Sequence, residues 1–244
     1  MAGIRAVLFD WGGTLTRFHS VDMIDAWRVA AQVLAPDRAD EVADALLAAE
    51  SEVWARTTST LRSATTAEVL RNASAAVGLP VEEVLHDDAI TRYLEHWAPF
   101  TDARPDARRV LHALRDRGLR TGLLSNTHWP RDWHEQWLSR DGLLDLLDAR
   151  VYTSDLEHVK PHPEAFRELL GQVQVEPSEA VFVGDRLHDD VGGAAALGMR
   201  TVWIRNDAVP HADVTPDAAV DDLSKLVGLV DDWMKPVGSQ AQAG

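Results

Sequence analysis

The sequence contains no cysteine and no long apolar run. Because all 244 residues lack a thiol, disulfide bonds, thiolate metal sites and a cysteine nucleophile are excluded. The first twenty residues lack an apolar stretch of signal-peptide length, and no later stretch approaches the roughly 18 apolar residues of a membrane span. These absences predict a cytoplasmic protein with no membrane partner.

Positive charge is also scarce. The chain has 24 Lys and Arg against 39 Asp and Glu, which gives a formal net charge of −15. A nucleic-acid partner requires a basic surface that replaces the counterions of the phosphates, so this charge argues against one. Lysine occurs only at Lys160, Lys225 and Lys235. A lysine with a chemical role therefore has few possible positions.

Four short runs of β-branched and aromatic residues predict buried strands. They cover Ala6–Phe9 and residues 122–124, 181–183 and 202–204. Each is bounded by Gly, Asp or Ser, and most are followed by an apolar repeat of helical period. Helices are expected at residues 102–117 and 163–170. The alternation predicts an α/β fold with a doubly wound parallel sheet, whose ligands bind at the carboxyl ends of the strands.

The segment between the first two predicted strands shows almost only helical periodicity. Apolar residues recur there at helical steps, and breaks fall at Pro36 and at Gly78-Leu79-Pro80. We expect residues 18–99 to form a small helical domain inserted after the first strand, which could cover the strand ends. Residues 1–17 and 100–237 then form the core domain, and the polar tail, residues 238–244, is expected to be disordered.

A carboxylate and a glycine-rich turn follow the first predicted strand. The run reads Asp10-Trp11-Gly12-Gly13-Thr14. It places an anionic nucleophile where backbone N–H groups can also hold a phosphate. Taken alone, the run is equally consistent with a surface turn.

Polar residues also follow two later strands. Ser125 and Asn126 end the strand at residues 122–124, where they suit hydrogen bonding to phosphoryl oxygens or, alternatively, capping of the next helix. Asp185 ends another strand, and Asp189 and Asp190 follow one turn later. Clustered carboxylates suit Mg²⁺, which prefers oxygen ligands.

Lys160 stands just before a predicted helix, next to Pro161 and close to Pro163. The two prolines restrict the backbone on either side of His162. In a chain with so few lysines, we interpret Lys160 as a charge placed for a phosphoryl group rather than as a solvated surface residue.

Taken in chain order, from Asp10 through Ser125 and Lys160 to Asp185, the four segments resemble the four motifs of the haloacid dehalogenase (HAD) superfamily of hydrolases. The resemblance extends from Val7 to about Leu229, and residues 190–194 add to it. It implies a HAD-like fold and a Mg²⁺-dependent phosphatase of a small phosphorylated metabolite, which reacts through a phospho-aspartate. The helical segment matches the C1 cap of the family, which closes over the site and commonly selects the substrate.

The resemblance also implies a role for each motif residue. Asp10 is the expected nucleophile, and Lys160 is expected to offset charge around the phosphoryl group. The expected Mg²⁺ ligands are Asp10, the backbone carbonyl of Gly12 and Asp185, with Asp189 and Asp190 supporting them. The residues expected around the phosphoryl group are Trp11, Gly12, Gly13, Thr14, Ser125 and Asn126.

Gly12 departs from the family pattern. Most phosphatases of the family carry a second aspartate at this position, which protonates the leaving oxygen and later activates water. Such help is typically worth ~10²- to 10⁴-fold in rate. Phosphonatase-like members have a small residue there and use a cap lysine, but no lysine precedes Lys160 in this chain. Haloacid dehalogenases have an aromatic residue there and dispense with metal, whereas Asp185 is retained here.

Three interpretations remain open. The protein is a phosphatase of good leaving groups such as acyl phosphates, or a phosphatase whose acid lies elsewhere, or a phosphate-binding regulatory module with little turnover. His19, His128 and His188 are the candidate substitute acids, although each could equally be a surface or capping residue. We favour the enzyme, because the other motif residues are intact.

Tryptophans form a regular pattern after the second strand. Trp129, Trp133 and Trp137 recur at four-residue spacing, which predicts one apolar helix face in the core or at an interface. A homodimer would be one use of such a face, and nothing else in the sequence supports it. Three further tryptophans are expected to pack within the helical segment: Trp27, Trp54 and Trp97.

Overall fold

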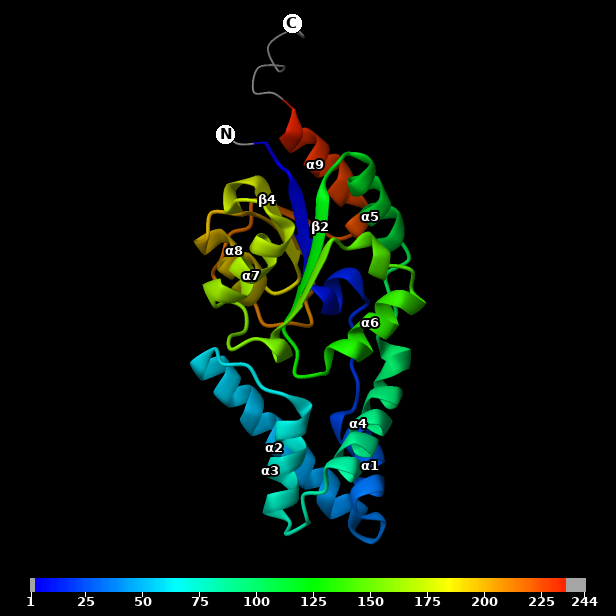
Figure 1. Cartoon of the computed structure of the whole chain (residues 1–244). Coiled ribbons are helices and arrows are strands. Elements are labelled where there is room, and N and C mark those ends of the chain that lie inside the picture. The colour runs from blue at the N-terminus through cyan, green and yellow to red at the C-terminus, as the bar shows by residue number, and fades with distance from the viewer. Residues whose placement is uncertain (1–2, 236–244) are drawn as a thin grey trace, which may run out of the picture.

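A computed structural model describes residues 3–235, so the predicted disordered tail lies outside the described residues. The centre of the fold is a parallel six-stranded sheet with the order β3-β2-β1-β4-β5-β6 (Figure 1). The strands are β1 Ala6–Phe9, β2 Arg120–Ser125, β3 Ala149–Tyr152, β4 Ala180–Gly184, β5 Arg200–Ile204 and β6 Ala218–Val220. The order reverses at β1, so the carboxyl ends of β1, β2 and β4 meet where such sheets bind ligands.

All four predicted strands are present, and two edge strands were missed. β3 and β6 lie at opposite edges of the sheet. β3 carries Arg150 in its interior, and β6 is only three residues long. Neither therefore shows the continuous apolar run that marks a buried central strand.

Helices cover both faces of the sheet. Side chains of β1 alternate: Val7 and Phe9 belong to one core cluster, whereas Ala6 and Leu8 belong to another. The first cluster includes α5 Ala107–Asp116, α6 Arg131–Arg140 and α9 Leu226–Met234, and the second includes α7 Pro163–Val173 and α8 Gly193–Ala196 (Figure 1). The sheet is thus buried on both sides, which explains why its central strands are almost wholly apolar.

α5 begins later than predicted. The expected start was residue 102, but the helix begins at Ala107. Asp102 accepts the backbone N–H of Arg17, and Ala103 pairs with Thr16 in a β-bridge. These residues are therefore held in an extended connection beside the chain that follows β1.

Four helices occupy residues 23–97. They are α1 Met23–Leu34, α2 Ala39–Thr60, α3 Thr66–Ala76 and α4 Glu83–Trp97. They pack against one another beyond the carboxyl ends of the strands (Figure 1). The breaks fall at Pro36 and Gly78, as predicted. Within this segment the rings of Trp27 and Tyr93 stack 3.9 Å apart, so an aromatic core joins α1 to α4.

Short helical turns connect these elements. Six are 3-10 turns: Pro36–Arg38, Ala98–Phe100, Leu144–Leu146, Thr153–Asp155, Pro177–Glu179 and Leu223–Lys225. Two wider turns, Trp11–Leu15 and Leu187–Gly192, follow β1 and β4. These two turns carry part of the first and fourth motifs, and Asp10 and Asp185 lie just before them.

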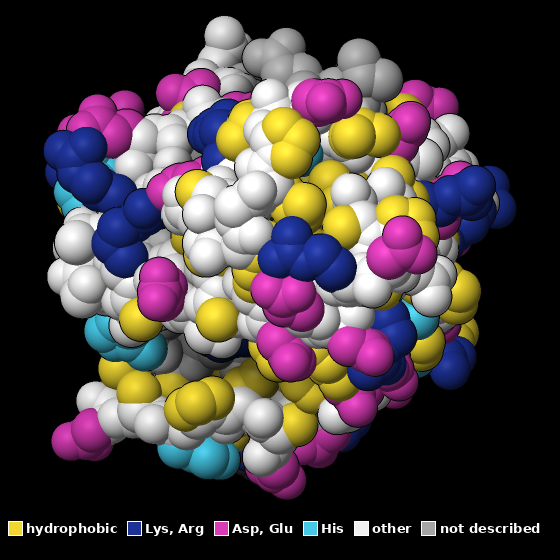
Figure 2. All heavy atoms as spheres, turned by 90° about the horizontal axis from the view of Figure 1, so that it is seen from below, with side chains coloured by type: hydrophobic (Ala, Val, Ile, Leu, Met, Phe, Trp, Pro, Cys, Tyr) yellow, Lys and Arg dark blue, Asp and Glu magenta, His cyan; other side chains and the backbone are white. Residues whose placement is uncertain are grey.

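The surface beside the helical segment is mixed in charge. Seen from that end, Lys and Arg side chains are interspersed with Asp and Glu (Figure 2). Among the helices of residues 3–235, none combines the length and the apolar character needed to cross a bilayer.

Phe166 anchors α7 to the sheet and gives a test of the core. Its ring is 1% exposed and meets the ring of Phe182 at 5.1 Å. Phe166→Ala should lower the free energy of unfolding by ~3–5 kcal/mol, because it removes buried area and leaves a cavity. Urea denaturation measures this change. Val81→Ala at a 52% exposed position should change stability by less than ~0.5 kcal/mol; equal effects would contradict the packing described.

Candidate active site

The turn after β1 brings Asp10 into a crowded pocket. Gly13 in this turn has φ +80°, a left-handed conformation that favours glycine. A Cβ at Gly13 would also lie 2.2 Å from Oδ2 of Asp185. Arg104 donates a 2.9 Å hydrogen bond to the carbonyl of Gly13. Glycine at position 13 is therefore required both by the backbone and by the closeness of the second carboxylate.

Lys160 lies at the centre of the site. Its ammonium donates to Oδ1 of Asp10 at 2.6 Å, to Oδ1 of Asp190 at 2.7 Å and to the carbonyl of Leu124 at 2.9 Å. The Lys160 side chain is only 1% exposed. Burial lowers its pKa, but the charges of Asp10 and Asp190 outweigh this effect and raise the pKa above its ordinary value. Lys160 is therefore a fixed, permanently charged group.

Asp190 is a buried anchor rather than an open ligand. Its Oδ2 accepts the backbone N–H of Arg186 at 2.9 Å, and its Oδ1 is occupied by Lys160. Gly184 makes room for it, because a Cβ there would lie 2.3 Å from the Asp190 side chain. Burial raises the pKa of Asp190, and the charge of Lys160 opposes that rise.

Asp185 has one occupied and one unpaired oxygen. Its Oδ2 accepts a 2.7 Å hydrogen bond from the amide of Asn206, whereas its buried Oδ1 has no hydrogen-bond partner. Burial, together with the negative charge of Asp10, raises the pKa of Asp185 to about 6. A cation close to Oδ1 would remove this penalty.

The carboxylate cluster fits a divalent cation. Oxygens of Asp10, Asp185 and Asp190 lie within 4.8 Å of one another. Three carboxylates and the ammonium of Lys160 sum to a charge of −2 when all are ionised. The donor set is all oxygen and includes the unpaired Oδ1 of Asp185, which suits Mg²⁺ better than a soft metal.

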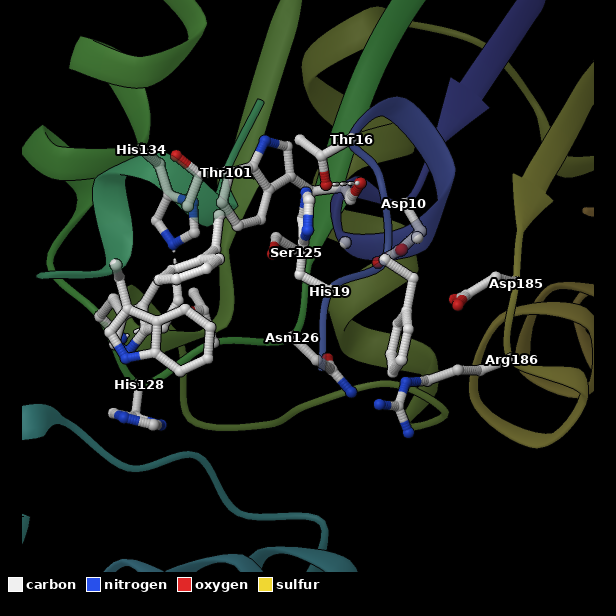
Figure 3. Close-up of a pocket in the computed structure, with 18 of the residues that line it drawn as sticks. Asp10, Thr16, His19, Thr101, Ser125, Asn126, His128, His134, Asp185 and Arg186 are labelled. Carbon is white, nitrogen blue, oxygen red and sulfur yellow. Dashed lines mark hydrogen bonds between the residues drawn. The ribbon is translucent and has the colours of Figure 1, made fainter. Parts of the chain in front are cut away.

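A cavity of about 370 Å³ opens above this cluster. Asp10, Asp185 and Arg186 lie together at one end, while His128 lies at the other, next to the helical segment (Figure 3). Ser125 lines the middle of the cavity. The aromatic residues of the wall are Trp11, Phe18, Trp54, Tyr93, Trp97, Phe100 and Trp129. The volume is typical of a small-molecule pocket.

Three predicted site residues have surroundings that the sequence did not suggest. The side-chain amide of Asn126 binds the backbone of Lys160 twice, at 2.9 and 2.8 Å. Thr14 is fully buried and is not part of the cavity wall. Asp189 is half-buried and lies outside the carboxylate cluster.

The three candidate histidines differ in position. His19 lines the cavity and forms a 2.7 Å pair with Asp102. His128 lines it too, and burial lowers its pKa to about 4. His188 is exposed and lines a separate hollow beside Lys160.

The aromatic stripe is only partly helical. α6 begins at Arg131, so Trp129 precedes the helix and does not share its face as predicted. Trp137 is buried and stacks on Trp11 with 5.8 Å between ring centroids. Trp133 and Trp129 are partly buried and pack against the same core. The stripe thus supports the turn that carries Asp10.

Gly12 leaves the site open at the position where most family phosphatases have their acid. A Cβ built there meets nothing within 4 Å, and its φ of −72° and ψ of 120° suit any L-residue. The fold therefore does not require glycine at position 12, in contrast to Gly13.

Sequence reasoning missed three residues that shape the site. Asn206 donates a hydrogen bond to Asp185, and Arg104 donates one to the carbonyl of Gly13 in the turn after β1. Glu50 of α2 adds a buried carboxyl to the cavity wall. Asn206 follows the predicted strand at residues 202–204, so its position was a signal. Glu50 and Arg104 carried no such signal, because only tertiary packing brings them near Asp10.

The chain belongs to the haloacid dehalogenase-like hydrolases. The family model with that description matches residues 4–198, and the sheet order and motif positions described above agree with the HAD resemblance of the sequence.

Similar proteins include phosphatases and a dehalogenase. The chain is 34% identical over 143 residues to a glyceraldehyde 3-phosphate phosphatase of Pyrococcus furiosus, with 56% of this chain and 58% of that protein covered. It therefore spans less than two thirds of this relative. A HAD phosphatase structure from Thermococcus onnurineus has TM-score 0.65 and 25% identity, covering 93% and 98% of the two chains. A 2-haloacid dehalogenase structure from Pseudomonas syringae pv. tomato has TM-score 0.74 and 26% identity, covering 94% and 99%.

His134, at the back of the cavity, gives a pH test of the site. Its ring is fully buried, and burial lowers its pKa from 6.5 to about 3. The unfolded chain therefore binds this proton more readily than the folded protein between these values, so acid favours unfolding. This residue alone should lower stability by ~1.4 kcal/mol per pH unit below about pH 6.

The measurement is urea denaturation of wild type and His134→Gln at pH 7.5 and pH 5. The variant should lose about 2 kcal/mol less than wild type on acidification, whatever its stability at pH 7.5. His112→Gln, at an exposed histidine of α5, is the matched control. An identical pH dependence in wild type and His134→Gln would refute a neutral, buried His134.

Proposed function

We propose that the protein is a Mg²⁺-dependent phosphatase of small phosphorylated metabolites, with Asp10 as the nucleophile. One observation carries this proposal: Asp10 faces the cavity between a fixed ammonium and a second carboxylate with an unpaired oxygen. The Asp10 side chain is 9% exposed, against 1% for Lys160 and 0% for Asp190. The similarity to named phosphatases supports the same activity.

Charge explains why a cation is part of the proposal. A phosphate group carries up to two negative charges and would meet a cluster that sums to −2. Mg²⁺, held by Asp10 and Asp185 and by the backbone carbonyl of Gly12, would supply the positive charge that draws the phosphoryl group to the nucleophile. Lys160 binds one oxygen of Asp10, which leaves the other oxygen free to attack.

The reaction has two displacement steps. In the first, an oxygen of Asp10 forms a bond to phosphorus, and the bond from phosphorus to the leaving oxygen breaks. In the second, water attacks the phospho-aspartate, inorganic phosphate leaves and the carboxylate of Asp10 is restored. Ser125 lines the same cavity as Asp10, and we propose that its hydroxyl binds a phosphoryl oxygen.

The missing acid restricts the first step. A poor leaving group needs a proton as its bond breaks, and Gly12 cannot supply one. Acyl phosphates leave without such help, so we propose that they, or other esters with good leaving groups, are turned over best. A phosphate-binding module with little turnover is the second candidate, and the absence of a carboxyl at Gly12 is the observation that favours it.

Haloacid dehalogenation is less well supported by the site. Displacement of a halide from carbon by Asp10 requires no cation. In this protein Asp185 places a second carboxylate against Gly13 of the nucleophile's turn, where it raises the negative charge without helping such a displacement. The same carboxylate has an evident use in holding Mg²⁺ beside a phosphate.

The test is phosphate release from acetyl phosphate and p-nitrophenyl phosphate, with Mg²⁺ or with EDTA. We expect Mg²⁺-dependent turnover of acetyl phosphate by wild type and its loss in Asp10→Asn. Gly12→Asp should accelerate the aryl ester by at least ~10-fold, because the new carboxyl fits the open space and restores general acid–base help. Asp116→Asn, an exposed carboxylate at the end of α5, is the matched control.

Two outcomes would count against the proposal. Equal rates in Mg²⁺ and in EDTA would remove the role of the cation. No turnover by wild type or by Gly12→Asp, combined with saturable binding of beryllofluoride, would establish the phosphate-binding module instead.

A further inference from the structure

Glu50 is a buried carboxyl in the cavity wall, and the proposed reaction does not use it. It lies on α2 and is 5% exposed. Its Oε2 accepts a 2.7 Å hydrogen bond from the indole of Trp27, and its Oε1 lies 3.5 Å from the hydroxyl of Tyr93. Among the residues that line the cavity, Glu50 is the only carboxyl besides Asp10 and Asp185.

Within residues 3–235, Glu50 forms no ion pair with a lysine or an arginine. The one titratable basic side chain within ion-pair distance of it is His128. The ring nitrogen of His128 lies 3.4 Å from Oε1, but burial keeps the pKa of this histidine near 4, so it is neutral at pH 7. Burial raises the pKa of Glu50, and hydrogen bonds from Trp27, Trp54 and Tyr93 reduce this rise without cancelling it. The indole N–H of Trp27 can only donate, which favours the carboxylate form.

Aromatic rings surround this carboxyl and continue along the cavity wall. Tyr93 lies 6.3 Å from Trp97 and 6.4 Å from Trp129, ring centroid to centroid, and Trp97 and Trp129 are 5.1 Å apart. The ring of Trp54, which also lines the cavity, lies 5.3 Å from the ring of His128, centroid to centroid. The faces of such rings are negative and attract cations, most strongly where water is excluded.

We propose that this end of the cavity, formed by Glu50 and the rings of Trp54, Tyr93, Trp97 and Trp129, binds an organic ammonium group of the substrate. The inference rests on the proposed phosphatase function. The substrate class is then a phosphate ester whose leaving group departs readily and also carries an organic ammonium group, with its phosphate at Asp10 and its cation at Glu50. A carboxylate within an aromatic cage is the combination that recognises such cations.

The alternative is that Glu50 is purely structural. It joins α2 to Trp27 of α1 and to Tyr93 of α4, and this contact alone would stabilise the helical segment. The two roles differ in one respect: a structural Glu50 would affect all substrates equally, whereas a cation site discriminates between a charged head group and a neutral one of the same shape.

The decisive comparison uses phosphocholine and 3,3-dimethylbutyl phosphate, which share one shape and differ in the charge of the head group. Their alkoxide leaving groups need a proton that Gly12 cannot supply, so both esters are assayed with Mg²⁺ in the Gly12→Asp background. There we expect kcat/KM for phosphocholine to be higher by ~10-fold or more. In that background, Glu50→Gln should reduce this preference to about threefold or less, chiefly through KM for phosphocholine. Glu52→Gln, an exposed carboxyl on the same helix, should keep the full preference.

A Gly12→Asp preference below about twofold, or a preference that the added Glu50→Gln change retains, would overturn the inference. In either case turnover of the neutral ester would show that the phosphatase proposal itself survives. If Glu50→Gln fails to fold, as circular dichroism would reveal, Trp54→Leu and Trp97→Leu test the same site through the loss of the ring faces.

A second measurement does not depend on turnover. Choline and its neutral analogue 3,3-dimethylbutanol are titrated into the protein, and binding is followed by tryptophan fluorescence, to which the caged indoles should respond. We expect saturable quenching by choline, little by the alcohol, and loss of the choline response in Glu50→Gln. Equal responses to both ligands, or none, would refute the cation site even if no phosphate ester is turned over.

Discussion

The buried ammonium of Lys160 is the interaction on which the site depends. It joins the carboxyl end of β1, through Asp10, to the turn after β4, through Asp190, and it reaches the backbone of β2 at Leu124. Removing one partner of such a buried set leaves an uncompensated charge, which is strongly destabilising. The carboxyl ends of the three central strands are therefore tied to one buried charge.

This arrangement divides the carboxylates into separate tasks. Both oxygens of Asp190 accept hydrogen bonds, one from Lys160 and the other from the backbone N–H of Arg186. Asp190 therefore positions other groups and does not face the cavity. Asp185 keeps one oxygen unpaired, and Asp10 keeps one clear of Lys160. The number of open oxygens, rather than the number of acidic residues, decides where a cation and a phosphoryl group can bind.

The sequence predicted the central strands and the residues at their carboxyl ends. Parallel strands bring their carboxyl ends to one edge of the sheet, and this does not depend on the conformation of the loops. Asp10, Ser125 and Asp185 follow from that rule. The edge strands, the late start of α5 and the place of Trp129 before α6 were not predictable, because local pattern does not report edge pairing or loop contacts. Glu50 was missed for a related reason, since its partners lie on other helices.

The charge of the whole molecule bears on which phosphate esters suit the site. A net charge of −15 would repel an anionic substrate on its way to the proposed Mg²⁺ site, and an ionised Glu50 would add a further negative charge inside the cavity. A zwitterionic ester carries its own positive group, so both the long-range repulsion and the local one are reduced. If the protein is the phosphatase proposed above, its acidity and the carboxyl in its aromatic wall match a cationic head group electrostatically better than a second anion.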